Sequence, residues 1–337
     1  MTQLSIRRAT GYVVTAAAAW GTGGAAGSLL FAAGGLDALD VTFWRFLLGA
    51  AFLLPLLGLP LLGSPLLGSP RFGQPRLGGA RLRPDRHLRG HVLVVGAGMA
   101  VYQAAYFAAI ARSGVAVATV ITMGATPVFT ALGGRLFLRE RLGATGLAAL
   151  LAALAGLALL VAGSPGEHPA PLGPDPAPAG TAGPEVAAAP GDPLAGAGYA
   201  MLSAFGYAGV TLLSRRRGTA AEPGSPLATA AAGFLVGAAC VLPFALAGGV
   251  LPQLSWESAA LLVFLGAVPT ALAYGLFFRA LGTLSATTVA IVSLGEAAFA
   301  ALVGVALLGE RPGPWGWAGC ASLLLAGVVP AWRARRE

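Results

Sequence analysis

Residues 116–154 read AVATVITMGATPVFTALGGRLFLRERLGATGLAALLAAL, and residues 286–324 read ATTVAIVSLGEAAFAALVGVALLGERPGPWGWAGCASLL. At a shift of 170 positions these two stretches are identical at 13 of 39 positions, including Phe129 with Phe299. Even in a chain rich in Ala, Gly and Leu, this agreement exceeds what random pairing gives. The two stretches therefore indicate an internal repeat, which divides the chain into related halves.

The composition around this repeat is that of a membrane protein. Hydrophobic residues make up 56% of the 337 residues and charged residues only 10%, whereas a soluble domain carries about 25% charged residues. A helix needs about 20 apolar residues to cross the hydrocarbon core of a bilayer. We expect ten such spans, at residues 10–33, 41–62, 92–111, 114–134, 142–163, 194–214, 228–250, 258–278, 285–308 and 314–332.

Five spans lie in each half. Because five is odd, the second half must enter the membrane in the opposite orientation. Inverted repeats are typical of secondary transporters, which bind substrate at the repeat interface near the midplane. The expected fold class is all-α integral membrane, with ten transmembrane helices as two inverted five-helix repeats.

Two segments between the spans lack the apolar residues that ordering would require. Residues 63–91 contain four prolines and six arginines, and residues 164–193 contain nine prolines, four acidic residues and no basic residue. Both segments are expected to be disordered. The predicted organisation is a first five-helix repeat at 1–163, with 63–91 as a cytoplasmic loop, an extracytoplasmic linker at 164–193 and a second repeat at 194–337.

The arginines predict the orientation. If both termini are cytoplasmic, the cytoplasmic segments contain 18 of the 21 arginines, and only Arg45, Arg112 and Arg311 lie on or toward the outside. Basic residues concentrate in cytoplasmic loops, so we expect a multi-pass protein of the cell membrane with both termini inside. A signal peptide is the alternative for the first span, but that span is long enough to cross and no clear cleavage site follows it.

Short motifs in the spans carry a family resemblance. They are Ala19-Trp20-Gly21, Phe43-Trp44-Arg45-Phe46, Ala125-Thr126-Pro127-Val128-Phe129, Leu138-Arg139-Glu140-Arg141-Leu142, Leu294-Gly295-Glu296-Ala297-Ala298-Phe299 and Leu308-Gly309-Glu310-Arg311. In these motifs, and in their order and spacing, the chain resembles the EamA family of the drug/metabolite transporter superfamily. The family usually has Glu-Pro in helix 9, where this chain has Ala297 after the acid. Helix 4 has the proline, but Thr126 replaces the acid.

The resemblance implies ten helices, no bound cofactor, and transport, often export, of small metabolites or drugs. It does not imply one particular substrate.

Glu296 is the main candidate for a role in transport. It lies near the middle of span 285–308, where an ionisable group costs about 2.5–3.5 kcal/mol on insertion scales. One interpretation is a protonatable group that couples export to proton entry or binds a cationic substrate. The alternative is a protonated carboxyl group that serves packing.

Aromatic and polar residues predict a central cavity for mixed polar and apolar solutes. Tyr102 and Tyr106 share one helix face because they are four residues apart, and Tyr207 and Tyr274 lie at roughly equivalent depths in the other half. The substrate cavity candidates are Trp20, Tyr102, Gln103, Tyr106, Thr122, Tyr207, Tyr274 and Glu296. Anchoring at the membrane interface is the alternative for the aromatic residues.

Thr119, Thr122 and Thr126 recur at spacings of three and four residues just before Pro127. A proline frees a backbone carbonyl one turn earlier, so we expect a helix break at Pro127. A simple kink with threonine hydroxyls bonded to the backbone is the commoner alternative.

Other residues at the spans receive structural interpretations. Arg45 is expected to extend to the lipid headgroups, with an outer salt bridge to Asp37 or Asp40 as the alternative. Four glycines are expected to allow close helix packing or, equally, rocking movements across smooth helix contacts, and two Glu-Arg pairs are expected to anchor helix ends. These are Gly21, Gly23, Gly24 and Gly27, and Glu140-Arg141 and Glu310-Arg311.

Other function classes lack their motifs. The three histidines, His87, His91 and His168, lie in loops or at a span edge, and Cys240 and Cys320 lie in apolar runs. The chain has no phosphate-binding Gly-x-x-x-x-Gly-Lys loop and no Gly-x-Ser-x-Gly turn. We expect no catalytic residue, no metal site, no cofactor and no nucleic acid partner.

The expected function is therefore secondary transport, most simply export of small metabolites or amphipathic compounds by alternating access, with or without proton coupling. The partners are a small-molecule substrate and the lipid bilayer, and a monomer is compatible with this arrangement. A membrane-embedded structural or regulatory protein, or an importer of a small solute, is the alternative.

Overall fold

The apolar segments form helices because a backbone inside lipid must satisfy its hydrogen bonds internally. The computed structural model describes residues 4–34, 36, 38–56, 86–163, 193–219, 226–248, 255–308 and 311–333, and within these every regular element is helical. The elements are α1 (Ile6–Gly34), α2 (Ala38–Leu56), α3 (Arg86–Phe137), α4 (Ala144–Ala162), α5 (Pro193–Thr219), α6 (Pro226–Gly248), α7 (Trp256–Gly266), η2 (Ala267–Leu272), α8 (Ala273–Leu281), α9 (Ala286–Ser293), α10 (Gly295–Val303), η3 (Gly304–Leu308) and α11 (Pro314–Arg333).

Seven helical segments among the described residues are long and apolar enough to cross a membrane. They are Gly90–Ala109, Val117–Phe137, Ala144–Ala162, Leu194–Arg216, Ala230–Ala247, Trp256–Leu281 and Ala286–Ala306. The prediction of an all-α membrane protein is confirmed. α1, α2 and α11 lie on the other three predicted spans but are not among the seven, so the full set of ten spans stays a prediction. Almost all of the predicted linker 164–193 and most of the predicted loop 63–91 lie outside the described residues. Residues 86–91, which were expected to be disordered, instead form the start of α3.

α3 is helical from Arg86 to Phe137, yet it bends so sharply that its two parts run in opposite directions. Its residues Tyr106 and Thr119 share a hydroxyl–hydroxyl hydrogen bond of 2.6 Å. On a straight helix, 13 residues span about 20 Å, so the chain must reverse between them. α3 therefore holds the two expected spans, 92–111 and 114–134.

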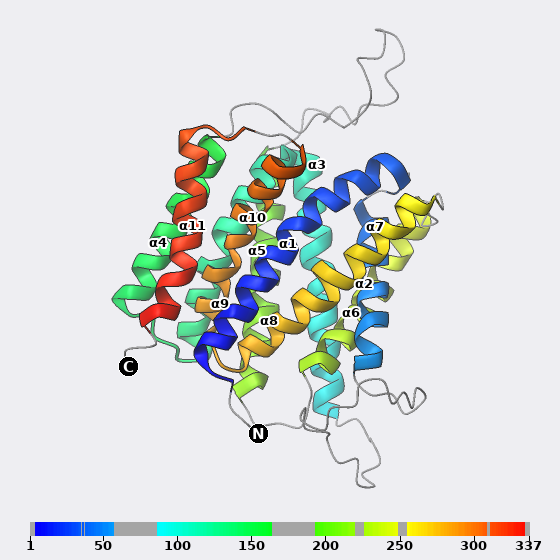
Figure 1. Ribbon diagram of the computed structural model, residues 1–337. Coiled ribbons are helices and arrows are strands. Elements are labelled where there is room, and N and C mark those ends of the chain that lie inside the picture. The colour runs from blue at the N-terminus through cyan, green and yellow to red at the C-terminus, as the bar shows by residue number, and fades with distance from the viewer. Residues whose placement is uncertain are drawn as a thin grey trace, which may run out of the picture.

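The helices pack into one bundle in which each half contacts the other (Figure 1). α3 packs on α5 and α6, α2 on α6 and α7, α1 on α8 and α10, and α4 on α11. α1 begins and α11 ends at the lower edge in Figure 1. We call this side the N-terminal face.

α4 and α11 meet most closely, through glycines. A Cβ atom on Gly156 would lie 3.0 Å from the carbonyl oxygen of Gly319, and one on Gly163 would overlap the backbone of Gly316. The Ser322 hydroxyl also donates to the carbonyl of Ala152 at 2.8 Å. We call this contact the α4–α11 seam.

Within the described residues, irregular turns interrupt the helices of the second half at 267–272, at Leu294 and at 304–308. The π-helical turn η2 joins α7 to α8, and the hydroxyl of its Thr270 donates to the Leu265 carbonyl of α7 at 2.7 Å. The predicted span 285–308 is divided at Leu294, where α9 ends and α10 begins. π-helical turns occur frequently at functional sites.

Candidate functional site

A cavity of about 210 Å³ lies between the two halves. Its wall is formed by Trp20, Arg45, Tyr102, Gln103, Tyr106, Thr122, Met123, Thr126, Ser203, Tyr207, Tyr274, Ala290, Ser293, Leu294 and Glu296. These residues come from α1, α2 and α3 of the first half and from α5, α8, α9 and α10 of the second. The cavity is therefore an interface between the halves.

All eight residues that the sequence suggested for a cavity lie on this wall. Interface anchoring does not describe the tyrosines, since Tyr102 and Tyr274 are 9% and 5% exposed and pack against each other inside the bundle. Whether each residue contacts a solute stays a prediction.

Tyrosine hydroxyls link the two halves beside the cavity. The hydroxyl groups of Tyr102 in α3 and Tyr274 in α8 share a buried hydrogen bond of 2.7 Å. The Ser203 hydroxyl of α5 donates to the backbone carbonyl of Tyr102 at 2.8 Å. Since a buried polar group must be paired to avoid a desolvation penalty, these bonds fix the tyrosine rings in place.

Two buried polar side chains on the wall have no hydrogen-bond partner among the described residues. They are the indole of Trp20, at Nε1, and the hydroxyl of Ser293. The Trp20 ring is held edge-on against Tyr274 and Phe277, with centroid distances of 5.0 and 5.4 Å. Because buried polar groups are seldom left unpaired, these groups are suited to bind a solute or water.

The expectation that Arg45 reaches the headgroups is wrong. Arg45 lines the cavity, and its Nε donates to the Thr270 hydroxyl at 3.4 Å. The π-helical turn η2 presents this hydroxyl. Asp37, one of the two proposed salt-bridge partners, lies outside the described residues.

Glu296 stands in the first turn of α10, immediately after the break at Leu294. It lines the cavity and keeps part of its accessible surface. The positive charge of Arg45 acts on it across the cavity, but the two side chains form no direct ion pair. The cavity thus offers one cation and one acid, each with unused hydrogen-bonding capacity.

The threonines of α3 bond to the backbone around Pro127. Thr126 donates to the Thr122 carbonyl at 2.7 Å, and Thr130 donates to the Thr126 carbonyl at 2.8 Å. Thr122 donates instead to the Ala200 carbonyl of α5 at 3.2 Å. α3 continues through Pro127 without a break, which differs from the expected interruption and agrees with threonine hydroxyls satisfying the backbone.

The sequence interpretation did not include Ser203 and Ser293 as wall residues. Helical spacing carries the signal for both, because Ser203 is four residues before Tyr207 and Ser293 is three residues before Glu296. Residues three or four apart share a helix face. Hydropathy alone did not reveal them, since a serine hardly changes the average of a span.

No group of three His, Cys, Asp or Glu residues within the described ranges could hold a metal ion. Cys240 is exposed and Cys320 is buried, both as free thiols. His168 lies outside the described residues. The cavity wall presents hydrogen-bonding groups, charged groups and aromatic surface.

Comparisons with known proteins agree with this architecture. The sequence pattern of the EamA-like transporter family matches residues 8–162 and 194–330. The uncharacterized transporter YwfM of Bacillus subtilis (strain 168) is 27% identical over 246 residues, which is 73% of this chain and 74% of that protein. The uncharacterized protein PA1977 of Pseudomonas aeruginosa (strain PAO1) is 31% identical over 218 residues, or 65% of each chain.

A solved crystal structure shares the fold. It superposes with a TM-score of 0.69 at 20% sequence identity and covers 97% of this chain and 98% of its own. The family match over both halves and the apolar spanning segments make the chain a multi-pass membrane transporter rather than an enzyme. The chain belongs to the EamA-like transporter family.

Proposed function

We propose that the protein is a secondary transporter that exports small metabolites or amphipathic compounds by alternating access around the central cavity. The observation that carries this proposal is the cavity itself, which lies between the two halves and is lined in part by polar groups that have no partner among the described residues. The bilayer surrounds the bundle, and ten spans form two inverted five-helix repeats, at 1–163 and 194–337.

The helix contacts support an inverted repeat. In an inverted repeat, the first span of one half corresponds to the first span of the other, the second to the second, and so on. Under this correspondence, the contact of α1 with α10 becomes the contact of α5 with the second crossing of α3. The contact of α2 with α6 and the contact of α4 with α11 each map onto themselves. All of these contacts are present in the bundle. A pseudo-twofold axis through the cavity accounts for this pattern.

Equivalent positions of the sequence repeat also meet at the cavity. At the shift of 170, Met123 corresponds to Ser293 and Thr126 to Glu296, and all four line the wall. Such a shared site near the midplane is typical of inverted-repeat transporters.

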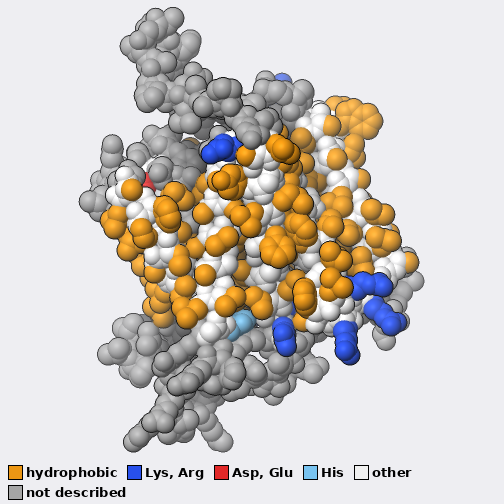
Figure 2. Space-filling view, turned by 180° about the vertical axis from the view of Figure 1, so that it is seen from behind, with side chains coloured by type: hydrophobic (Ala, Val, Ile, Leu, Met, Phe, Trp, Pro, Cys, Tyr) orange, Lys and Arg blue, Asp and Glu red, His pale blue; other side chains and the backbone are white. Residues whose placement is uncertain are grey.

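In the proposed orientation, the protein spans the plasma membrane and both of its termini lie in the cytoplasm. Seen from behind, apolar side chains cover the middle of the molecule and several arginine side chains project from the lower edge (Figure 2). That edge is the N-terminal face, which carries most of the chain's arginines in the proposed topology, as cytoplasmic faces do.

The cavity wall favours a solute with an apolar body and a polar or charged end. The rings of Trp20, Tyr207 and Tyr274 supply apolar surface, whereas Arg45 and Glu296 supply opposite charges. Small-molecule sites commonly combine many apolar contacts with a few placed polar groups.

Coupling to protons would use Glu296, the only acidic residue among the described residues of the wall. In this scheme the carboxyl group takes a proton from one side and releases it when substrate binds or when the cavity faces the other side. An uncoupled carrier would use the same cavity without this exchange.

The test is transport by purified protein in proteoliposomes with a broad panel of metabolites and drugs, with and without a pH gradient. We expect an opposed proton gradient to accelerate movement of at least one compound several-fold for the wild type but not for Glu296→Gln. Glu257→Gln, an exposed acid in the first turn of α7, is the matched control and should behave like the wild type.

Three results would count against the proposal. If Glu296→Gln keeps the pH response of the wild type, proton coupling through Glu296 is wrong. If no compound in the panel moves, the protein is better regarded as a structural or regulatory membrane protein. Net inward movement under every gradient would make it an importer.

A further inference from the structure

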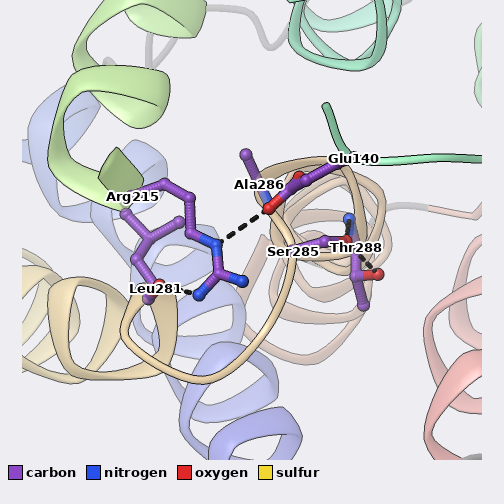
Figure 3. Close-up of polar contacts among 6 residues, drawn as sticks. All are labelled: Glu140, Arg215, Leu281, Ser285, Ala286 and Thr288. Atoms are coloured by element: carbon purple, nitrogen blue, oxygen red, sulfur yellow. Dashed lines mark hydrogen bonds and ion pairs between the residues drawn. The ribbon is translucent and has the colours of Figure 1, made fainter. Parts of the chain in front are cut away.

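Glu140 joins three segments of the chain at the N-terminal face (Figure 3). Its Oε1 atom accepts a hydrogen bond from Arg215 Nε at 2.9 Å, and its Oε2 atom accepts one from the backbone N–H of Ala286 at 3.0 Å. Arg215 also donates from Nη1 to the Leu281 carbonyl at 2.7 Å. Glu140 belongs to the first half, and its two partners, Arg215 and Ala286, belong to the second, as does Leu281.

The backbone before Glu140 holds this side chain in position. α3 ends at Phe137, and the N–H of Glu140 returns to the carbonyl of Gly134 at 3.0 Å. Arg139 adopts a φ of 55°, the left-handed conformation that commonly ends a helix and that favours glycine. The backbone therefore adopts an unfavourable conformation at Arg139, immediately before Glu140 contacts the other half.

On the other side of the contact, Glu140 binds the start of α9. The Ser285 hydroxyl caps this helix by accepting the N–H of Thr288 at 3.2 Å. The N–H of Ala286 lies in the first turn and has no partner within the helix, so Glu140 supplies one. A carboxylate at this end is also favoured by the helix dipole.

α9 connects this contact to the cavity. It begins at Ala286 and ends at Ser293, a length of about 12 Å. Ala290 and Ser293 line the cavity, and all residues of α9 except Thr288 are buried. α9 thus fills the space between the cavity and the N-terminal face, with Glu140 bound to its outer end.

We propose that the contacts of Glu140 with Arg215 and Ala286 form a latch that holds α9 across the entrance from the N-terminal face. The latch must open for the cavity to be reached from that face. This inference rests on the proposed function, because only a protein that alternates its access needs such an entrance. The division of the helix at Leu294 allows α9 to move while α10 stays in place.

The chemistry suits a bond that forms and breaks during each cycle. The contacts are charge-assisted, which makes them stronger than neutral hydrogen bonds. The side chains of Arg215 and Glu140 remain 13% and 17% exposed, so water can replace the partners when they separate. A fully buried ion pair would resist such separation.

The first experiment measures access to the cavity from each face and needs no substrate. A Ser293→Cys probe is placed in a chain with Cys240→Ala and Cys320→Ala, and a membrane-impermeant maleimide is added to one face of oriented vesicles. We expect slow labelling from the N-terminal face with the latch intact and at least tenfold faster labelling with Glu140→Gln or Arg215→Gln. Labelling from the opposite face should not rise.

Glu257→Gln is the matched control, since it removes one exposed carboxylate remote from the latch. Its labelling should equal that of the parent chain. If folded Glu140→Gln and Arg215→Gln chains label at the parent rate, or faster from both faces equally, the latch is overturned and the contacts only anchor the helix ends.

A second experiment closes the latch instead of opening it, and so does not depend on the stability of the loosened variants. Cysteines introduced by Glu140→Cys and Arg215→Cys are joined by a short bifunctional maleimide in the same cysteine-free background. We expect the joined protein to lose transport and to block the Ser293→Cys probe from the N-terminal face only. Continued transport by the joined protein would overturn the latch.

The proposed function can fail separately. In that case the wild type moves no compound, yet labelling at Ser293→Cys still responds to the latch substitutions.

Discussion

The hydroxyl groups of Tyr102 and Tyr274 satisfy each other in a buried position where no other described side chain bonds to them. Tyr102→Phe removes one hydroxyl and leaves the other without its partner. An unsatisfied buried hydroxyl costs about 1–3 kcal/mol. We therefore expect each single substitution, Tyr102→Phe or Tyr274→Phe, to lower the melting temperature of the protein in detergent.

The double substitution provides the control for this prediction. With both hydroxyls absent, no polar group is left unpaired, and the double variant should be more stable than the sum of the single effects by about 1 kcal/mol. Strict additivity in thermal unfolding would mean that the bond contributes nothing specific. The cavity would then not depend on this pair for its shape.

Some cavity residues could be predicted from the sequence and others could not. Glu296 was identifiable because an acid in an apolar span is costly, and the tyrosines because ring and hydroxyl suit a mixed cavity. Arg45 was misassigned because its position along the span suggested a headgroup contact, whereas the hydroxyl of Thr270 that it meets comes from 225 residues away. No local pattern contains that contact.

Among the helices, α1 depends on glycine where it crosses α10. A Cβ atom on Gly21 would lie 2.7 Å from the Cβ of Phe299 and 2.8 Å from the backbone nitrogen of Ala300. Gly21→Ala must therefore push the two helices apart, at a cost of about 1–3 kcal/mol. We expect a lower melting temperature and a change in transport, because both helices carry cavity residues.

Gly27 lies on the same helix and provides a matched control. A Cβ atom there meets nothing within 4 Å, so Gly27→Ala should leave stability unchanged or slightly raised. Thermal unfolding of both variants in parallel makes the comparison. Equal losses at the two positions would show that the glycines act through helix flexibility and not through the contact with α10.

The helical elements were largely predictable, but their interruptions were not. Span lengths follow from the hydrocarbon thickness, which is why 142–163 and 194–214 correspond closely to α4 and α5. The π-helical turn at 267–272 and the division at Leu294 leave no mark in the hydropathy of the sequence, and the contact of Thr270 with Arg45 joins residues far apart in the chain. Pro127 was the obvious place for a break, yet the helix is continuous through it, with the Thr126 hydroxyl bonded to the carbonyl of Thr122.

At the scale of the whole molecule, the proposed topology is directly testable. We expect a C-terminal green fluorescent protein fusion to fluoresce and a C-terminal alkaline phosphatase fusion to be inactive, because the arginine distribution places that end inside. Fusions within 164–193 should give the opposite pattern. Active phosphatase at the C-terminus would mean that the orientation is reversed or that the number of crossings is odd.

Substituting arginines supplies the control for orientation. Changing the cluster Arg215-Arg216-Arg217 to neutral residues weakens the bias of one cytoplasmic segment only, so the fusion pattern should persist. Because orientation reflects the sum of many basic residues, a reversal caused by this one cluster would contradict the arrangement in which 18 arginines act together.

The α4–α11 seam leaves little freedom for those two helices to slide, since a single added methyl group at Gly156 would already meet the backbone of Gly319. One helix of the pair comes from each half, so the halves are fastened along one margin of the bundle. In the proposed alternating-access cycle, the displacement of one half relative to the other would then grow with distance from this seam. α7, at the opposite margin in Figure 1, would sweep the widest arc, and a tag attached beside the seam would disturb turnover least.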